Sequence, residues 1–319
     1  MRFLEIMDTM SKDLKGPLFP NVGSGTYTNM NSMDAPLWFF WSLQQYIQFT
    51  GDSKTVKKRY LDKLKGIIDG YRAGTDFNIH MLDNGLIYGG EEGICLTWMD
   101  AVTPDGPVTP RTGCPVEIQA LWYNALCFYH KLTGDQEIAE LAEKVKSSFE
   151  AEFWDEEKGY LADVVQGNEK DWSIRPNMVF ATSLPYTMLS EGQNDQILEL
   201  AKSNLLTTRG LRTLAPDDPA YKGYYFGDQI SRDQAYHNGT VWVWPMGHFV
   251  EGYIKLHGKS AKNFIGKIIK GFDGVMTQYG VGTVAEIFDG DPPHRPKGAV
   301  SQAWSVAELL RMMELVKSL

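Results

Sequence analysis

The sequence of 319 residues predicts an all-α fold of the (α/α)6-type helical barrel, a toroid of paired helices, apparently lacking its first helical hairpin. Two observations lead to this prediction. The same helical hairpin recurs along the chain, which is typical of an array of repeated helical pairs. Each repeat also joins an aromatic-rich, mostly apolar helix to a charged amphipathic helix. This alternation suggests an inner ring of buried helices that is wrapped by an outer ring.

The hairpin of residues 115–153 shows the pattern most clearly. In GDQEIAELAEKVKSSFEAEF, Leu141, Val145 and Phe149 follow the spacing of a helix with one buried stripe. The preceding segment, CPVEIQALWYNALCFYHKLT, is apolar nearly all round, as expected of a helix packed on both sides. A short turn at Gly134 separates the two helices.

The other hairpins follow the same order. We expect inner helices near residues 34–50, 115–132, 176–190, 240–256 and 299–317, and outer helices near 2–15, 53–72, 135–153, 194–204 and 260–279. The chain thus begins with an outer helix and ends with an inner one, so a ring of six pairs lacks its first hairpin. We expect residues 1–319 to form a single barrel domain that is incomplete at its N-terminus.

The missing hairpin has an energetic consequence. Its absence exposes the apolar flanks of the neighbouring helices, which costs about 25 cal/mol per Å² of apolar surface. We therefore expect an N-terminal domain, a partner chain or self-association to cover this gap, with the helix at 2–15 covering part of it.

Composition excludes several classes of function. The net charge of -9 argues against a nucleic-acid-binding surface, which requires clustered Lys and Arg. No apolar run reaches the roughly 18 residues of a membrane span, and the first residues lack the pattern of a secretion signal. Cys95, Cys114 and Cys127 are too widely spaced for a zinc site or a disulfide framework. We expect a cytoplasmic protein without a metal or cofactor.

Aromatic residues make up 12% of the chain. Such side chains fill cores, and they also cover the apolar faces of sugar rings, so composition leaves both roles open. The long loops that precede the inner helices share one face of the expected barrel, where residues distant in sequence converge.

The first two of these loops each contain a candidate acid. Asp34 precedes an inner helix and either caps it or binds a ligand. Asp100 lies beside Trp98 in LTWMDA, where a poorly solvated carboxyl favours the protonated form and suits a proton donor. The alternative for Asp100 is an ordinary turn-forming aspartate.

The later loops add other candidates. DWSIRPNMVF contributes Arg175 and Asn177, and SRDQAYHNGTVWVWPMG contributes His237 and Trp242. A histidine among aromatics is more often structural, so His237 is at most a hydrogen-bond donor to a ligand, and the tryptophan is equally suited to the core.

The last loop, AEIFDGDPPHRPKG, carries Glu286 and two aspartates. Asp289 and Asp291 lie in Asp-Gly and Asp-Pro-Pro turns, so Glu286 is the acid that we expect to face a shared cavity. Two carboxyls on different loops with aromatics between them suit glycoside hydrolysis, and widely separated loops favour the inverting geometry with carboxyls about 6.5–9.5 Å apart.

These motifs resemble a known family. LTWMDA, PVEIQALWYNAL, RPN, GLRTLAPDDPAYKG, AYHNGTVWVWPMG and AEIFDGDPPHRPKGAVSQAWSVAELLR are similar, in that order, to the C-terminal amylo-α-1,6-glucosidase domain of glycogen debranching enzymes. The resemblance implies an (α/α)6 barrel that removes α-1,6-linked glucose stubs from glycogen or limit dextrin with inversion. It also implies that Asp100 is the general acid and Glu286 the general base. The residues that we expect to bind the sugar are Asp34, Trp38, Trp98, Trp122, Arg175, His237, Trp242 and Phe288.

The chain departs from the family at several positions. An Arg-Asp motif before the first inner helix is absent upstream of Asp34, Met30 replaces a tyrosine and Cys114 a lysine. The sequence therefore leaves three explanations open: a fragment, one half of a split enzyme, and a degenerate ring. The alternative functions are another helical-barrel glycosidase, acting on trehalose, mannosides or α-glucosides, and a non-catalytic glycan-binding subunit.

Overall fold

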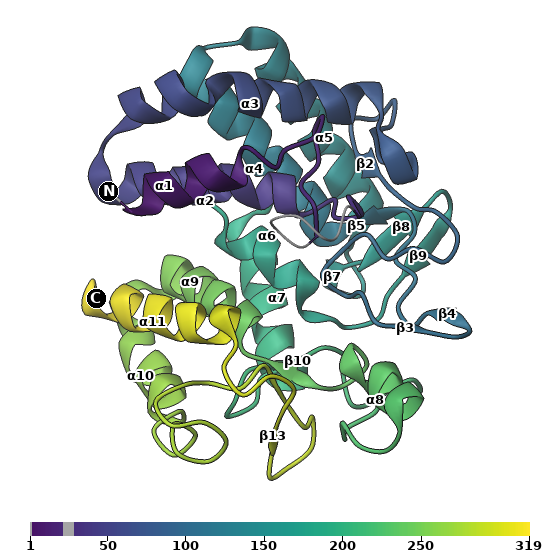
Figure 1. Ribbon diagram of the computed structural model, residues 1–319, viewed down its shortest axis with the longest axis vertical. Helices are drawn as coiled ribbons and strands as arrows, with labels where there is room; N and C mark the ends of the chain where they lie inside the picture. The colour runs from purple at the N-terminus through teal and green to yellow at the C-terminus, as the bar shows by residue number, and fades with distance from the viewer. Residues whose placement is uncertain (1, 22–28) are drawn as a thin grey trace. The chain divides into compact units, whose positions relative to one another are not determined.

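The computed structural model describes residues 2–21 and 29–319, and about half of them are helical (Figure 1). The helices are α1 (Arg2–Met10), α2 (Ala35–Thr50), α3 (Ser53–Ala73), η1 (Asp76–Asn78), α4 (Val116–Thr133), α5 (Gln136–Phe153), η2 (Pro176–Met178), α6 (Val179–Ser183), α7 (Glu191–Asn204), α8 (Gln229–Tyr236), α9 (Trp244–His257), η3 (Gly258–Ala261), α10 (Lys262–Lys270) and α11 (Ala303–Lys317). The prediction of a mostly helical fold is confirmed.

Short strands lie between the helices. They are β1 (His80–Met81), β2 (Ile87–Tyr88), β3 (Val102–Thr103), β4 (Gly106–Pro107), β5 (Cys114–Pro115), β6 (Trp154–Asp155), β7 (Tyr160–Leu161), β8 (Val164–Gln166), β9 (Glu169–Asp171), β10 (Leu211–Arg212), β11 (Val241–Trp242), β12 (Ile287–Phe288) and β13 (Pro296–Lys297). None exceeds three residues, so the strands fasten loops together and do not form an independent layer.

The described chain divides into two compact units. The first unit comprises residues 1–100, 110–152 and 164–169, and the second comprises residues 101–109, 153–163 and 170–319. The single barrel domain over 1–319 stays a prediction.

In the first unit, the expected inner helices α2 and α4 pack against each other, and the outer helix α3 contacts both of them. Tyr60, Tyr71 and Trp122 are fully buried in its core. The turns that join the helices end at Gly51 and Gly134 with φ of 72° and 77°, a left-handed conformation that glycine adopts without strain. An outer helix that spans two inner helices is the local arrangement that the repeated hairpin predicts.

In the second unit, α9 lies between α6 and α11, and all three are expected inner helices (Figure 1). The outer helix α7 contacts α6 and α9, while α10 contacts α11 and reaches α9 through η3. Phe249, Phe272 and Met312 are buried in a core that these helices share. The packing order within this unit therefore repeats that of the first unit.

An antiparallel sheet in the second unit runs β10-β11-β12-β13. Its register pairs Trp242 with Ile287 and Ile287 with Lys297. Because β11 directly precedes α9, and β12 and β13 precede α11, the sheet ties together the loops that lead into two inner helices.

Several helices differ from the expected ranges. α6 ends at Ser183 because Leu184 takes an extended conformation before Pro185, as a residue preceding proline tends to do. α9 begins at Trp244 because Val241 and Trp242 join the sheet. α8 was expected to be loop, since its sequence QISRDQAY lacks a continuous apolar stripe.

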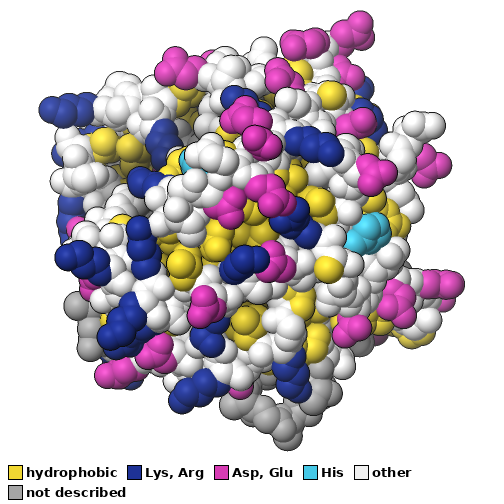
Figure 2. All heavy atoms as spheres, turned by 90° about the horizontal axis from the view of Figure 1, so that it is seen from above, with side chains coloured by type: hydrophobic (Ala, Val, Ile, Leu, Met, Phe, Trp, Pro, Cys, Tyr) yellow, Lys and Arg dark blue, Asp and Glu magenta, His cyan; other side chains and the backbone are white. Residues whose placement is uncertain are grey.

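Basic and acidic side chains are interspersed around hydrophobic ones on the face shown in Figure 2. Among the described residues, no helix has both the length and the hydropathy that crossing a bilayer requires.

Candidate active site

Glu286 lies in the second unit directly before β12 and is held by neighbouring donors. Its Oε1 accepts hydrogen bonds from Tyr236 Oη at 2.7 Å and from Gln302 Nε2 at 3.4 Å. Its Oε2 accepts from the backbone N–H of Ala299 at 2.8 Å. The residue is half-buried. These donors match an ionised carboxylate, which can only accept hydrogen bonds, and they fix the direction in which the group points.

The sheet register explains why Glu286 has room for this conformation. Since Ile287 pairs with Lys297, Gly298 lies opposite Glu286 on the neighbouring strand. A Cβ atom at Gly298 would lie 2.3 Å from Glu286 Oε2, closer than real Cβ atoms approach. Gly298 also has a φ of 69°, in the left-handed region. A side chain at this position would therefore strain the backbone and displace the carboxylate of Glu286.

Aromatic rings pack behind Glu286. The ring of Tyr236 lies 5.1 Å from that of Trp242, and His237 stacks on Trp242 at 5.6 Å with an interplanar angle of 18°. Trp242 Nε1 donates to the carbonyl of Tyr236 at 3.2 Å. His237 is fully buried and Trp242 nearly so. The structure thus gives these two predicted sugar-binding residues a packing role that positions Tyr236.

Arg175, at the start of η2, is also buried and contacts protein acceptors. Its Nη1 donates to the carbonyls of Thr213 at 3.1 Å and His237 at 2.6 Å, and its Nη2 donates to Asn238 Oδ1 at 3.0 Å. These hydrogen bonds brace the loop after α8, and the expectation that Arg175 contacts the sugar stays a prediction.

Phe288 follows Glu286 by two residues and points into the core. It is fully buried in the cluster that includes Val241 and Phe249. Its ring is therefore covered by protein in this structure, and a role of Phe288 in sugar binding stays a prediction.

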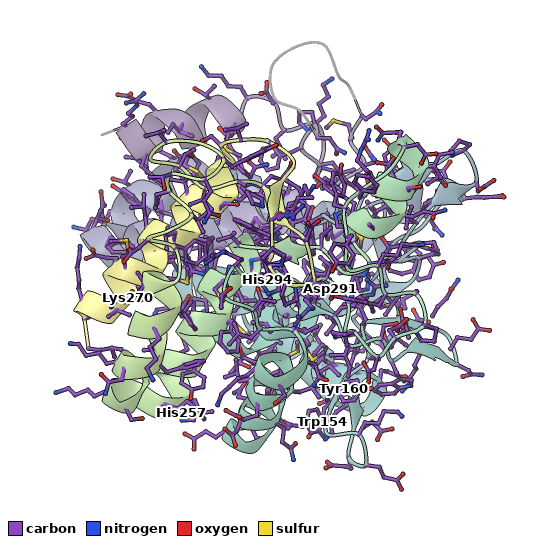
Figure 3. The ribbon with its side chains drawn as sticks, turned by 90° about the horizontal axis from the view of Figure 1, so that it is seen from below. Trp154, Tyr160, His257, Lys270, Asp291 and His294 are labelled. Carbon is purple, nitrogen blue, oxygen red and sulfur yellow. The ribbon has the colours of Figure 1, made fainter. Side chains whose placement is uncertain are left out.

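The neighbouring aspartates tie the loop between β12 and β13 to the segment before α8. Asp289 Oδ1 accepts from the N–H of Tyr225 at 2.9 Å, and Asp291 Oδ1 accepts from Tyr221 Oη at 2.9 Å. Figure 3 labels Asp291 together with His294, whose N–H donates to the Asp291 carbonyl at 3.0 Å. Both aspartates are therefore engaged by protein donors, whereas Glu286 lies directly before β12.

In the first unit, the loop with Trp98 and Asp100 is tied to the segment before α2. The N–H of Met33 donates to the Leu96 carbonyl at 2.9 Å. Trp98 is buried, whereas Asp100 is exposed. Burial raises the pKa of the Cys95 thiol to about 11, and the Asp100 charge adds to this shift. Asp100 lies where the chain leaves the buried segment 95–99, and its role as the general acid stays a prediction.

Asp34 is buried at the start of α2, where the loop 95–100 contacts Met33. Burial raises the pKa of its carboxyl, and the hydrogen bond from Ser32 Oγ at 2.5 Å opposes this rise. The Asp34 side chain makes no capping hydrogen bond to α2. The capping alternative therefore lacks its defining contact, and the structure brings Asp34 and the Asp100 loop to the same end of α2.

The other two predicted residues of this unit differ in burial. Trp122 is fully buried, stacks on Tyr71 at 5.9 Å and donates from Nε1 to the Gly85 carbonyl at 3.1 Å. Trp122 is thus packed in the core of this unit, and its role in sugar binding stays a prediction. Trp38 is half-buried and meets Trp41 edge-on at 5.6 Å.

Sequence reasoning missed several residues around these loops. Arg111 forms a buried pair with Glu117, with Nη2 donating to Oε2 at 2.7 Å, and its Nη1 donates to Thr97 Oγ1 at 3.2 Å, next to Trp98. Tyr236 and Gln302 were likewise not identified. Their contacts depend on tertiary packing, and the local sequence around each gives no signal of them.

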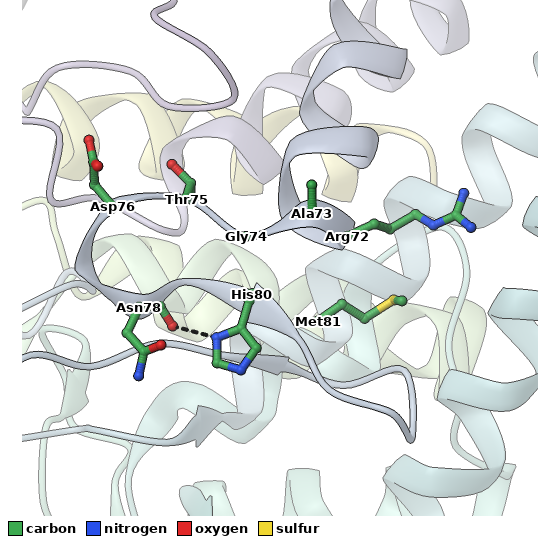
Figure 4. A pocket seen from close by; sticks show the side chains of 8 residues that line it. All are labelled: Arg72, Ala73, Gly74, Thr75, Asp76, Asn78, His80 and Met81. Carbon is green, nitrogen blue, oxygen red and sulfur yellow. Dashed lines mark hydrogen bonds between the residues drawn. The ribbon is translucent and has the colours of Figure 1, made fainter.

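A surface depression of about 510 Å³ lies at the end of α3 in the first unit (Figure 4). It is lined by Arg72, Ala73, Gly74, Thr75, Asp76, Asn78, His80 and Met81, none of which is a predicted site residue. Within the described residues, no group of His, Cys, Asp and Glu side chains is placed to hold a metal ion.

The comparisons with known proteins place the chain among the glycoside hydrolases. A family model described as amylo-alpha-1,6-glucosidase matches residues 3–311, so the chain belongs to this family. The chain is also similar to the glycogen debranching enzyme of Saccharomyces cerevisiae, with 23% identity over 347 aligned positions that cover 79% of this chain and 23% of the relative. It thus spans about a quarter of the relative's length.

Proposed function

We propose that this chain hydrolyses the α-1,6 linkage of single glucose stubs on a branched, glycogen-type α-glucan, with inversion at the anomeric carbon. The observation that carries the proposal is Glu286, a carboxylate oriented by Tyr236, Ala299 and Gln302 on a chain that matches the amylo-alpha-1,6-glucosidase family over nearly its whole length. The similar yeast protein is named a glycogen debranching enzyme, which supports this class of substrate.

In the proposed reaction, Asp100 is the general acid and Glu286 the general base. Glu286 takes a proton from a water molecule whose oxygen attacks C1, and the carboxyl of Asp100 gives its proton to the departing O6. The C1–O6 bond breaks as the C1–O(water) bond forms on the opposite face of the ring. The products are β-glucose and a chain with a free 6-hydroxyl group.

We propose that Asp34, Trp98 and Trp38 contribute to the glucose-binding surface on the first unit. Their support is the contact between the segment before α2 and the loop of Asp100. The helix packing within each unit supports an (α/α)6-type barrel, since each of α3 and α7 contacts two expected inner helices. The free thiols of Cys95, Cys114 and Cys127 accord with the reducing cytoplasm that we propose as the location.

Free glucose is the product that tests this function. The purified chain is incubated with a phosphorylase limit dextrin, trehalose and an α-mannoside, and glucose or mannose is measured enzymatically. We expect glucose from the limit dextrin and no sugar from the other substrates. Release from trehalose or the mannoside alone would instead assign the chain to another helical-barrel glycosidase.

A second candidate is a non-catalytic glycan-binding subunit, favoured by the departures from the family at Met30 and Cys114. This function predicts that the chain binds limit dextrin without releasing glucose. It also predicts that Asp100→Asn and Glu286→Gln bind limit dextrin as the unmutated chain does and likewise release no glucose.

A further inference from the structure

Trp304 lies at the first turn of α11, between residues that contact Glu286. Gln302 Nε2 donates to Glu286 Oε1 at 3.4 Å, and Ser305 Oγ donates to the Glu286 carbonyl at 3.4 Å. Trp304 was not among the predicted site residues. Its position in the chain therefore puts an indole close to the proposed general base.

The Trp304 ring is anchored on one side and open on the other. Its centroid lies 5.5 Å from that of Trp244 and 6.4 Å from that of Trp242, both of which are buried. Trp244 in turn stacks on Phe180 at 4.9 Å with an interplanar angle of 18°. Despite these contacts, 49% of Trp304 remains exposed to solvent. A buried aromatic layer thus supports an indole that still presents surface to a ligand.

Burial separates Trp304 from the other aromatics near Glu286. His237, Trp242 and Phe288 are 0%, 3% and 0% exposed, so their rings are covered by protein. A pyranose ring presents apolar C–H groups on its faces, and aromatic side chains in ligand sites commonly cover such surfaces while polar groups bond the hydroxyls. An exposed indole beside a held carboxylate has the chemistry that this recognition requires.

We propose that Trp304 is an aromatic platform that stacks against a glucosyl ring of the α-glucan chain on the Glu286 side of the site. The proposal rests on the proposed function and deepens it, because it names the residue that binds the glucan next to the general base. Trp304 takes the role that the sequence assigned to Trp242 and Phe288, and Gln302 and Ser305 link its position to that of Glu286.

The same helix offers a competing explanation for this exposure. Ala303, Ala307, Leu310 and Met313 are also exposed on α11, and Leu310 is 60% exposed. An apolar stripe of this kind can dock against another helix. Leu310 lies six residues beyond Trp304, about 9 Å along the helix, so variants of the two residues separate a glucan platform from a protein-docking surface.

The test measures binding of maltohexaose, a linear α-1,4-glucan, by isothermal titration calorimetry in the Glu286→Gln background, where turnover is suppressed. We expect Trp304→Ala to weaken binding by about tenfold, which corresponds to about 1.4 kcal/mol, within the range of aromatic contacts. Trp304→Tyr keeps a ring, so its dissociation constant for maltohexaose should stay within about threefold of that of the Glu286→Gln parent. Leu310→Ala should bind maltohexaose like this parent.

Equal binding by the parent and Trp304→Ala would overturn the proposal, as would undetectable binding by the parent. If Trp304→Ala and Leu310→Ala both bind like the parent and both change the sedimentation coefficient, the stripe is a protein contact and the platform is wrong. Failure of the function itself is seen separately, as absence of glucose release from limit dextrin by the unmutated chain. A loss of maltohexaose binding in Trp304→Ala would support the platform even then.

Discussion

The proposed acid and the proposed base differ in how the protein holds them. Asp100, in the first unit, is exposed at the end of a buried loop segment. Glu286, in the second unit, is half-buried and accepts hydrogen bonds from Tyr236, Ala299 and Gln302. The difference teaches that the base is oriented by the fold of its own unit before substrate binds, since donors that hold a group in place reduce the reorganisation that the reaction requires. The proposed acid is exposed, so its desolvation is left to the bound substrate.

The largest expected effect comes from removing either carboxyl. We predict that Asp100→Asn and Glu286→Gln each lower kcat for limit dextrin by about 10²–10⁴-fold, the usual contribution of general acid–base catalysis. With α-glucosyl fluoride, whose fluoride leaves without a proton, Asp100→Asn should recover most of its activity. Glu286→Gln should not recover, because water must still be activated.

Glucose release from both substrates is the measurement, and circular dichroism checks that the variants are folded. Recovery of Glu286→Gln with the fluoride, and not of Asp100→Asn, would reverse the two roles. Failure of both variants to differ from the unmutated chain would remove both residues from the mechanism.

A smaller effect should follow from displacing Glu286 without removing it. In Gly298→Ala, the new Cβ would meet Glu286 Oε2, so the carboxylate must shift. Misplacement by about 1 Å can cost about 10²-fold in rate, and we predict a loss of that size in kcat. The matched control is Gly282→Ala, where φ is 70° and no atom lies within 4 Å of the added Cβ.

Both alanine variants place a side chain in the left-handed region, which costs about 1–2 kcal/mol of stability. Thermal unfolding measures this shared cost, and the difference in kcat between the variants isolates the contact with Glu286. Equal kcat values for Gly298→Ala and Gly282→Ala would show that the position of the carboxylate is not set by this contact.

Tyr236→Phe tests one donor of the base and should have a still smaller effect. A hydrogen bond to a charged group contributes about 1.5–3 kcal/mol, and at the lower end of this range we expect a loss of about tenfold in kcat/KM. Tyr225→Phe, whose ring lies 5.7 Å from that of Tyr236, is the control. An unchanged kcat/KM in Tyr236→Phe would mean that its hydroxyl serves packing alone.

The smallest expected effect concerns the thermal stability of the fold at acid pH, which is measured separately from activity. His248 on α9 is buried in the second unit, 2.7 Å from Ser183 Oγ through its Nδ1. Burial lowers the pKa of His248 well below its usual value, and the charges of Arg311 and Lys255 add to this shift. The folded state therefore binds this proton less well than the unfolded state.

A depressed histidine pKa contributes stability above the unfolded pKa of about 6.5, and this stability is lost as pH falls below that value. One proton corresponds to about 1.4 kcal/mol per pH unit. We predict that His248→Asn, which keeps a polar atom near the position of Nδ1, flattens the decline of the melting temperature between pH 6.5 and 5. An unaltered slope in this variant would assign the acid sensitivity to other groups.

Sequence patterns predicted the long helices well because periodicity reports one-sided burial. α3, α4 and α5 lie within one residue of the expected ranges, and each has a strong apolar pattern. Hydrophobic periodicity failed to predict the extents of α6 and α8, where local backbone chemistry determined the structure. Pro185 shortened α6, and the polar segment of α8 folded into a helix with Asp228 accepting from Ser231 N–H at its start.

Asp289 and Asp291 accept hydrogen bonds from Tyr225 and Tyr221 in the segment before α8, contacts that the turn chemistry of their own loop does not predict. The choice of Glu286 as the candidate base stays a prediction. The division of aromatics into buried Trp122, Trp242 and Phe288 and exposed Trp304 was not predictable, because exposure depends on which helices pack nearby. The need for Gly298 depends on the register of β12 with β13, which alternation in such short strands does not specify.

The anomer of the first glucose released tests the central claim most directly. Proton NMR of limit dextrin during the first minutes of hydrolysis distinguishes the α and β anomeric signals before they equilibrate. A general acid at Asp100 and a general base at Glu286 acting through water predict β-glucose. Initial release of α-glucose would contradict the inverting mechanism and the roles of both carboxyls.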